Sequence, residues 1–142
     1  MAIYEVDEFT FDVPDGYVDR SINIFVPPAG MMKRTPQSII ITREPRTEDT
    51  VGQQAGKLLK EFASKVPGVK LLGQRERVIG ALAGREARVH ATRDGVPIYQ
   101  RYFFIGHYGT FLSFLMTSTR AQSAQCDGLA ERVLSTVRLR KR

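Results

Sequence analysis

The stretch "PQSIIITRE", residues 36–44, places three isoleucines in succession at positions 39, 40 and 41. Consecutive side chains of a β-strand point to opposite faces of a sheet, so Ile40 faces one side and its two neighbours face the other. If this segment is a strand, both faces of the sheet are apolar at this point. Each face then needs a cover, either from the chain itself or from a partner.

The composition predicts one globular domain over residues 1–142. Hydrophobic residues make up 42% of the chain and charged residues 25%, which is ordinary for a soluble fold. The N-terminal "MAIYEVDEFTF" lacks the basic start and apolar run of a secretory signal, and no window approaches the ~20 apolar residues of a membrane span. A lone cysteine, Cys126, cannot form an internal disulfide and suits a reducing compartment. We therefore expect a cytoplasmic protein without direct membrane insertion.

The positive charge of the chain is concentrated at its end. The formal net charge is +6, and residues 138–142, "RLRKR", supply four of those charges, which leaves +2 for the rest. A nucleic-acid site needs a basic patch with reading elements or aromatic side chains that stack on bases, whereas a charged terminus is more simply a solvated tail. We expect no nucleic-acid partner and a mobile tail over 138–142.

Hydrophobic periodicity predicts an α+β fold with a single antiparallel sheet of about six to seven strands and two main helices packed on it. The first helix covers about residues 50–66, with a cap at Asp49 or Thr50 and a stop at Pro67-Gly68. The second covers about 121–137, and its apolar stripe includes Cys126. Short turns between the later strands favour an antiparallel meander. The predicted strands are 9–13, 21–26, 38–43, 69–79, 85–93, 98–105 and 110–119.

Residues with catalytic or metal-binding potential are sparse. His90 and His107 are not at metal-ligand spacing from each other or from Cys126. Cys126 lies in the apolar stripe of a helix, which favours a buried, inert thiol. The segment "GALAGRE", 80–86, lacks the lysine and hydroxyl of a phosphate-binding loop. We therefore predict no enzyme activity, no metal and no cofactor.

Several predicted strands have one wholly apolar face and one mixed face, in which Ser, Thr, Gln or Tyr interrupts the apolar residues. Helices, loops or a dimer partner could bury both faces. Alternatively, the mixed face forms an open groove for an apolar partner, whose polar groups bond to the hydroxyls and amides. The pattern leaves both possibilities open.

Four segments, in order and spacing, resemble the effector-associated (Eag-type) chaperones of bacterial type VI secretion. They are "FTFDVPDGYVDRSINIFVPP" (9–28), "IIITRE" (39–44), "VPGVKLLGQRERVIGALAGREA" (66–87) and "YQRYFF" (99–104). The resemblance implies a PsbP-like α/β sandwich and a cytoplasmic homodimer without catalysis. Its concave sheet surface would shield the N-terminal transmembrane helices of an effector and deliver that effector to the secretion apparatus.

The resemblance also implies client-binding residues. The residues that the resemblance places in the groove are Ile22, Ile24, Ile40, Thr42, Gln100 and Ser135, with Thr136 as an alternative to Ser135. A groove glutamine expected on the first helix has no clear equivalent, although Gln53 and Gln54 are near. Periodicity alone turns Ile22 and Ile24 toward the core, because Ser21 and Asn23 occupy the alternate face. We follow the resemblance and place both isoleucines in the groove.

Two further functions are compatible with these patterns. One is a regulatory or scaffold module of the same fold that binds a folded partner protein. The other is a small-ligand carrier or an enzyme that uses the mixed face as a pocket. The first predicts indifference to apolar peptides, and the second predicts saturation with a lipid or metabolite.

Overall fold

The computed structural model describes residues 2–5, 8–28 and 38–141. Six antiparallel strands form the main sheet in the order β3–β4–β8–β7–β6–β5. Its strands are β3 (Asn23–Phe25), β4 (Ser38–Pro45), β5 (Lys70–Ile79), β6 (Leu82–Arg93), β7 (Val96–His107) and β8 (Thr110–Thr119). The helices are α1 (Val51–Lys65), the 3-10 turn η2 (Arg120–Gln122) and α2 (Ser123–Leu134).

Two-residue loops connect the four long strands β5 to β8. Both residues of each loop, 80–81, 94–95 and 108–109, have positive φ. This is the conformation of type I′ turns, whose twist matches that of paired strands. Local sequence therefore sets the register of the meander, as the short predicted connections required.

Helix α1 begins and ends at strong local signals. The Thr50 hydroxyl accepts from the Gln53 backbone, and the Gln53 side chain bonds back to the Thr50 backbone, forming a capping box. Pro67 and Gly68 follow the last turn, where proline cannot continue a helix. Thr50 was one of the two predicted caps, and the predicted stop is confirmed.

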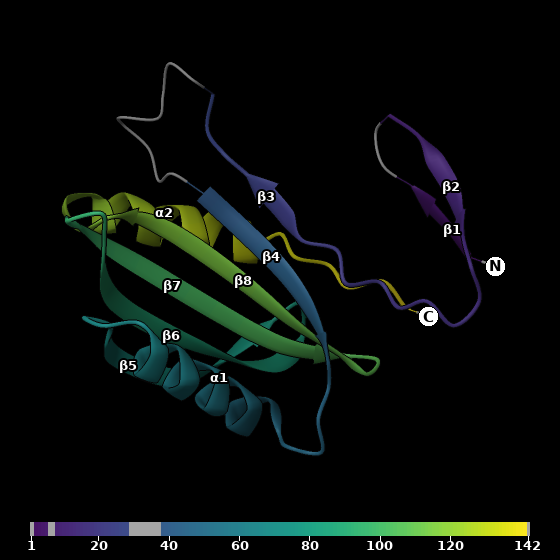
Figure 1. Cartoon of the computed structure of the whole chain (residues 1–142), viewed down its shortest axis with the longest axis horizontal. Coiled ribbons are helices and arrows are strands. Elements are labelled where there is room, and N and C mark those ends of the chain that lie inside the picture. Colours follow the sequence, from purple (N-terminus) through teal and green to yellow (C-terminus); the bar gives the residue numbers. More distant parts are fainter. Residues whose placement is uncertain (1, 6–7, 29–37, 142) are drawn as a thin grey trace.

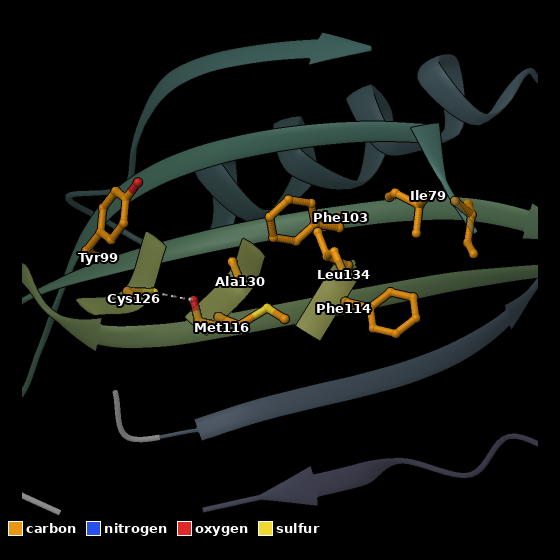
Figure 2. Packing of buried hydrophobic residues seen from close by; sticks show 9 residues of the cluster. Ile79, Tyr99, Phe103, Phe114, Met116, Cys126, Ala130 and Leu134 are labelled. Carbon is orange, nitrogen blue, oxygen red and sulfur yellow. Dashed lines mark hydrogen bonds between the residues drawn. The ribbon is translucent and has the colours of Figure 1, made fainter. Parts of the chain in front are cut away.

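The two helices lie on opposite faces of the sheet. Figure 1 shows α1 in front of the sheet and α2 behind it. Helix α1 contacts β5, β6 and β7, whereas α2 contacts β7 and β8. Ile39 and Ile41 pack on the α2 side. Figure 2 shows the centre of that side, with Phe103, Met116 and Leu134 gathered between strands and helix.

The α+β class and the helix pair match the sequence prediction, but the N-terminal region differs. The predicted strand 9–13 is β2 (Thr10–Val13), which pairs with β1 (Ala2–Glu5) in a separate two-stranded hairpin. Figure 1 shows this hairpin apart from the sheet. Alternation identified the strand but carried no information on its partner, because the same alternating pattern is compatible with pairing to any neighbouring strand.

Candidate functional site

One part of the α1-side face has no helix over it. We define this uncovered face by residues of β3, β4, β8 and β7: Ile24, Ser38, Ile40, Thr42, Ser113, Leu115, Thr117 and Gln100. Figure 1 shows the front of β4 and β8 free of any helix, since α1 lies over β5 and β6. The second face of the triple isoleucine, which Ile40 occupies, therefore remains without a helical cover.

The strand register brings the residues of this face together in rows. Directly paired residues of an antiparallel sheet share a face. One row runs Ile24–Ile40–Leu115–Tyr102, and a parallel row runs Ser38–Thr117–Gln100. Thr42 pairs with Ser113 in a third row. Apolar and hydroxyl-bearing rows thus alternate across the sheet, as expected for the mixed face.

Two polar groups of the Ser38–Thr117–Gln100 row lack partners. Gln100 and Thr117 are each 3% exposed. The Gln100 Oε1 and Thr117 Oγ1 atoms make no hydrogen bond with the described residues. A buried acceptor left unpaired costs about 1–3 kcal/mol. Neighbouring side chains shield both atoms from solvent, so a donor from outside the chain reaches them only when those side chains move aside. Gln100 is among the groove residues expected from the sequence and Thr117 is not, although alternation places Thr117 on one face with Ser113 and Leu115 of the same strand.

The structure decides the orientation of β3. Ile24 is 63% exposed and pairs with Ile40, so its side chain lies on the uncovered face. Ile22 is also exposed and directly precedes β3. Asn23 lies on the opposite face, where its side chain accepts from Arg43 Nη1 at 2.6 Å. Core burial of the two isoleucines, which alternation alone suggested, is therefore not what the fold adopts.

The remaining expected residues lie elsewhere. Ser135 caps the C-terminal end of α2, is exposed, and donates to the Arg132 carbonyl. Because α2 packs on the opposite face of the sheet, the structure does not bring Ser135 to Ile40 and Gln100. Thr136 directly follows Ser135 after the end of α2, and its side chain donates to the Val133 carbonyl.

The two candidate glutamines of α1 have local roles. Gln53 completes the capping box. Gln54 is buried, and its side chain donates to the Pro45 carbonyl and accepts from the Thr47 backbone. These bonds hold the connection between β4 and α1. Neither glutamine is on the uncovered face.

A network of ion pairs lies on the α2 side. Glu86 accepts from Arg75, Arg77 and Arg101. Arg77 also makes a bidentate pair with Glu131, with N–O distances of 2.7 and 2.6 Å. Burial alone would raise the pKa of Glu86, but the hydrogen bonds from the arginines and their charge outweigh it and lower that pKa. This network joins β5, β6 and β7 to α2.

The cysteine and histidines show no catalytic arrangement. Cys126 is buried, and burial raises the pKa of its thiol to about 11. His90 packs edge-on against Tyr99, and burial lowers its pKa. Among the residues that the structure describes, no group of three His, Cys, Asp or Glu side chains is placed to hold a metal ion. No helix in the described part of the chain is long and apolar enough to span a membrane.

Comparison with known proteins places the chain in a family. It is 28% identical over 122 residues to the Pseudomonas aeruginosa protein Effector EagT6. The alignment covers 85% of this chain and 84% of that protein. The Eag-type resemblance read from the sequence is thereby confirmed. The crystal structure of PA94 from Pseudomonas aeruginosa, a protein of unknown function, matches all of this chain and 99% of its own, at 24% identity with a TM-score of 0.81.

A more distant likeness confirms the PsbP-like fold. The cyanobacterial PsbP protein CyanoP from Synechocystis matches 88% of this chain and 96% of its own, at 10% identity with a TM-score of 0.55. None of these relatives is named as an enzyme. The model of the DcrB family matches residues 8–136. The chain therefore belongs to the DcrB family.

Proposed function

We propose that this protein is a cytoplasmic, non-enzymatic chaperone that binds an apolar N-terminal helix of a type VI secretion effector on the uncovered face. It shields that helix and delivers the effector to the secretion apparatus. One observation carries the proposal: an apolar sheet surface without a helical cover contains two buried acceptors without partners, Gln100 Oε1 and Thr117 Oγ1. The likeness to Effector EagT6 supports it.

The dimensions of the face suit such a client. Strand β8 has ten residues, which at about 3.3 Å per residue give a length of about 33 Å. A helix of ~20 residues is about 30 Å long. Full burial of each exposed isoleucine is worth about 1.5–3 kcal/mol. A client hydroxyl or amide that donates to Gln100 or Thr117 removes the cost of the unpaired acceptors.

We also propose a homodimer that forms through the N-terminal arm, defined as residues 2–5 and 8–22. A two-stranded hairpin by itself is marginally stable in water, and the arm exposes the large side chains of Phe9, Phe11, Tyr17 and Val18. Burying them against a second copy of the chain would stabilise the arm. Exposed apolar surface of this extent is typical of protein–protein contacts.

Strand β5, the edge strand of the sheet on the side away from β3, is poorly suited to pairing with a second copy of itself. Two copies of β5 that pair antiparallel about a two-fold axis place residues of the same face opposite each other. If the axis passes at residue 75, 76 or 77, an arginine of one copy (Arg75 or Arg77) lies opposite an arginine of the other copy. Like charges directly opposite are destabilising. A register irregularity between Leu71 and Gly73 further interrupts the strand, and such features protect edges from pairing.

Neighbouring isoleucines provide a test of client binding. The chain is co-expressed with the apolar N-terminal segment of a candidate type VI secretion effector, and co-elution of the soluble segment is measured. Ile40→Gln and Ile24→Gln should retain the melting temperature but lose the client. Ile39→Gln is the matched control, because it points to the α2-side core and should instead lower the melting temperature.

Two results would refute the proposed site. One is a large loss of stability in both Ile24→Gln and Ile40→Gln, which would make them core residues. The other is undiminished co-elution with the folded variants, which would move the client to another surface. Thr117→Val refines the test, since it removes one unpaired acceptor at nearly constant volume and should weaken binding only of clients that offer a donor.

A further inference from the structure

A second candidate site lies where the β5–β6 and β7–β8 turns meet the C-terminal segment. A cavity of about 340 Å³ is present there, within the range of small-ligand and side-chain pockets. Leu82 and Leu139 form its apolar part, and His107, Arg140 and Lys141 contribute polar groups. Leu139 packs with the α2-side core, so this cavity is separate from the uncovered face.

The C-terminal cations at this cavity are held in place by contacts. The sequence predicts a mobile tail over 138–142, of which the structure describes residues up to 141. The Leu139 side chain packs so close to Gly80 that a Cβ there would lie 3.2 Å from it. His107 Nε2 lies 2.8 Å from the Arg140 carbonyl, and donates to it. The backbone is therefore anchored directly before and at the first of the two cations.

These two cations also remain available to an external anion. Elsewhere in the described part of the chain, Arg75, Arg77, Arg85 and Arg101 are engaged in ion pairs. No ion pair among the described residues includes Arg140 or Lys141, and both are exposed. No Asp or Glu lines the cavity. The combination of an apolar floor and uncompensated positive charge is complementary to an acidic ligand that also carries an apolar group.

We propose that this cavity binds an acidic peptide segment of a partner protein. A carboxylate of the peptide pairs with Arg140, whose guanidinium can donate two parallel hydrogen bonds to it, and a second carboxylate pairs with Lys141. An aliphatic side chain between them contacts Leu82 and Leu139. A nucleic acid would require a longer basic track with several stacking aromatics, whereas this lining offers one phenol ring, that of Tyr108. This site is independent of the client face.

A peptide titration tests the site. The probe is a synthetic nonapeptide of alternating Asp and Glu with a central leucine, added to the full-length ¹⁵N-labelled protein. We expect saturable amide shifts at residues 106–108 and 139–141, and an affinity that falls as salt concentration rises. The double variant Arg140→Glu/Lys141→Glu should weaken binding at least tenfold. The control Lys60→Glu/Lys70→Glu makes the same charge change at exposed positions and should alter the affinity less than twofold.

Two further comparisons separate this site from non-specific attraction. Replacing the central leucine of the peptide by glycine should weaken binding several-fold, and His107→Ala, which frees the Arg140 carbonyl, should do the same without a change in melting temperature. Equal losses in the control double variant would overturn the proposal. So would shifts confined to other surfaces, or tighter binding of a single-stranded oligonucleotide at the same salt concentration.

Discussion

At the scale of single residues, Glu86 shows how a charge is made tolerable inside this fold. Its side chain is 4% exposed, and three arginines donate to it. Removing one partner of a buried ion pair leaves the other charges uncompensated. Arg77 and Arg101 also lie over the Phe103 ring, so their positions depend on the same cluster.

We expect Glu86→Gln to lower the free energy of unfolding by about 3 kcal/mol, the scale at which broken buried ion pairs act. The measurement is urea denaturation at pH 7. The control is Glu76→Gln, whose side chain is 90% exposed, and surface substitutions of this kind usually stay within about 0.5 kcal/mol. Equal effects of the two substitutions would show that the network adds no stability.

Glu86 should also make the folding stability of the protein sensitive to acid. The pKa values of Glu86 and Glu131 are lowered in the folded state, in the second case mainly by the hydrogen bonds from Arg77. As the pH falls below the ordinary value of 4.5, the unfolded chain takes up protons first, so stability is lost progressively below that pH. Glu86→Gln should therefore show a shallower decline between pH 5 and pH 3 than the unsubstituted protein.

At the scale of elements, two glycines differ in the space available for an added Cβ atom. Gly56 lies within α1, and a Cβ there would meet nothing within 4 Å. Gly84 lies in β6, where a Cβ would be 2.6 Å from the Phe104 carbonyl oxygen. The first glycine weakens a helix without a packing reason, whereas the second is required for the close approach of β6 and β7.

Gly56→Ala should raise the free energy of unfolding by about 0.5–1 kcal/mol, because alanine has the higher helix propensity. Gly84→Ala should lower it by about 1–3 kcal/mol through overpacking. Chemical denaturation of both variants provides the comparison. A stabilised Gly84→Ala variant would mean that β6 and β7 can move apart without cost.

Some properties of the elements were readable in the sequence and others were not. Local patterns predicted a helix cap at Asp49 or Thr50 and short turns between the later strands, because caps and turns depend on neighbouring residues. The separate pairing of β2 was not predictable, because its partner β1 is set by a chain reversal rather than by alternation. Thr117 was missed for a related reason: its lack of a partner becomes visible only when β7 and β8 are paired.

At the scale of the whole molecule, apolar side chains are distributed unevenly over the surface. The N-terminal arm exposes Phe11 and Val18, while the β5 edge exposes Val78. The proposed dimer predicts that the arm is buried in the assembly and that the β5 edge remains outside it. Replacing an exposed apolar residue by aspartate therefore tests the dimer when it is made in the arm, and the same replacement in the β5 edge is the control.

Light scattering coupled to size exclusion measures the outcome directly. The unsubstituted chain should elute as a dimer, and Phe11→Asp/Val18→Asp should shift it to a monomer with an intact fold by circular dichroism. Val78→Asp should leave the dimer unchanged. A monomer for the unsubstituted chain, or dissociation by Val78→Asp, would contradict the arm-mediated dimer.

The sequence by itself determined the two helices, the antiparallel meander and the α+β class, because caps, tight turns and apolar periodicity act over a few residues. The tertiary structure alone decided which side of the sheet each alternating set faces. Ile22 and Ile24 show the reason, because an alternating pattern is the same whichever face of the strand is buried. The buried face depends on where α1 and α2 pack, and those contacts link residues that are far apart in the chain.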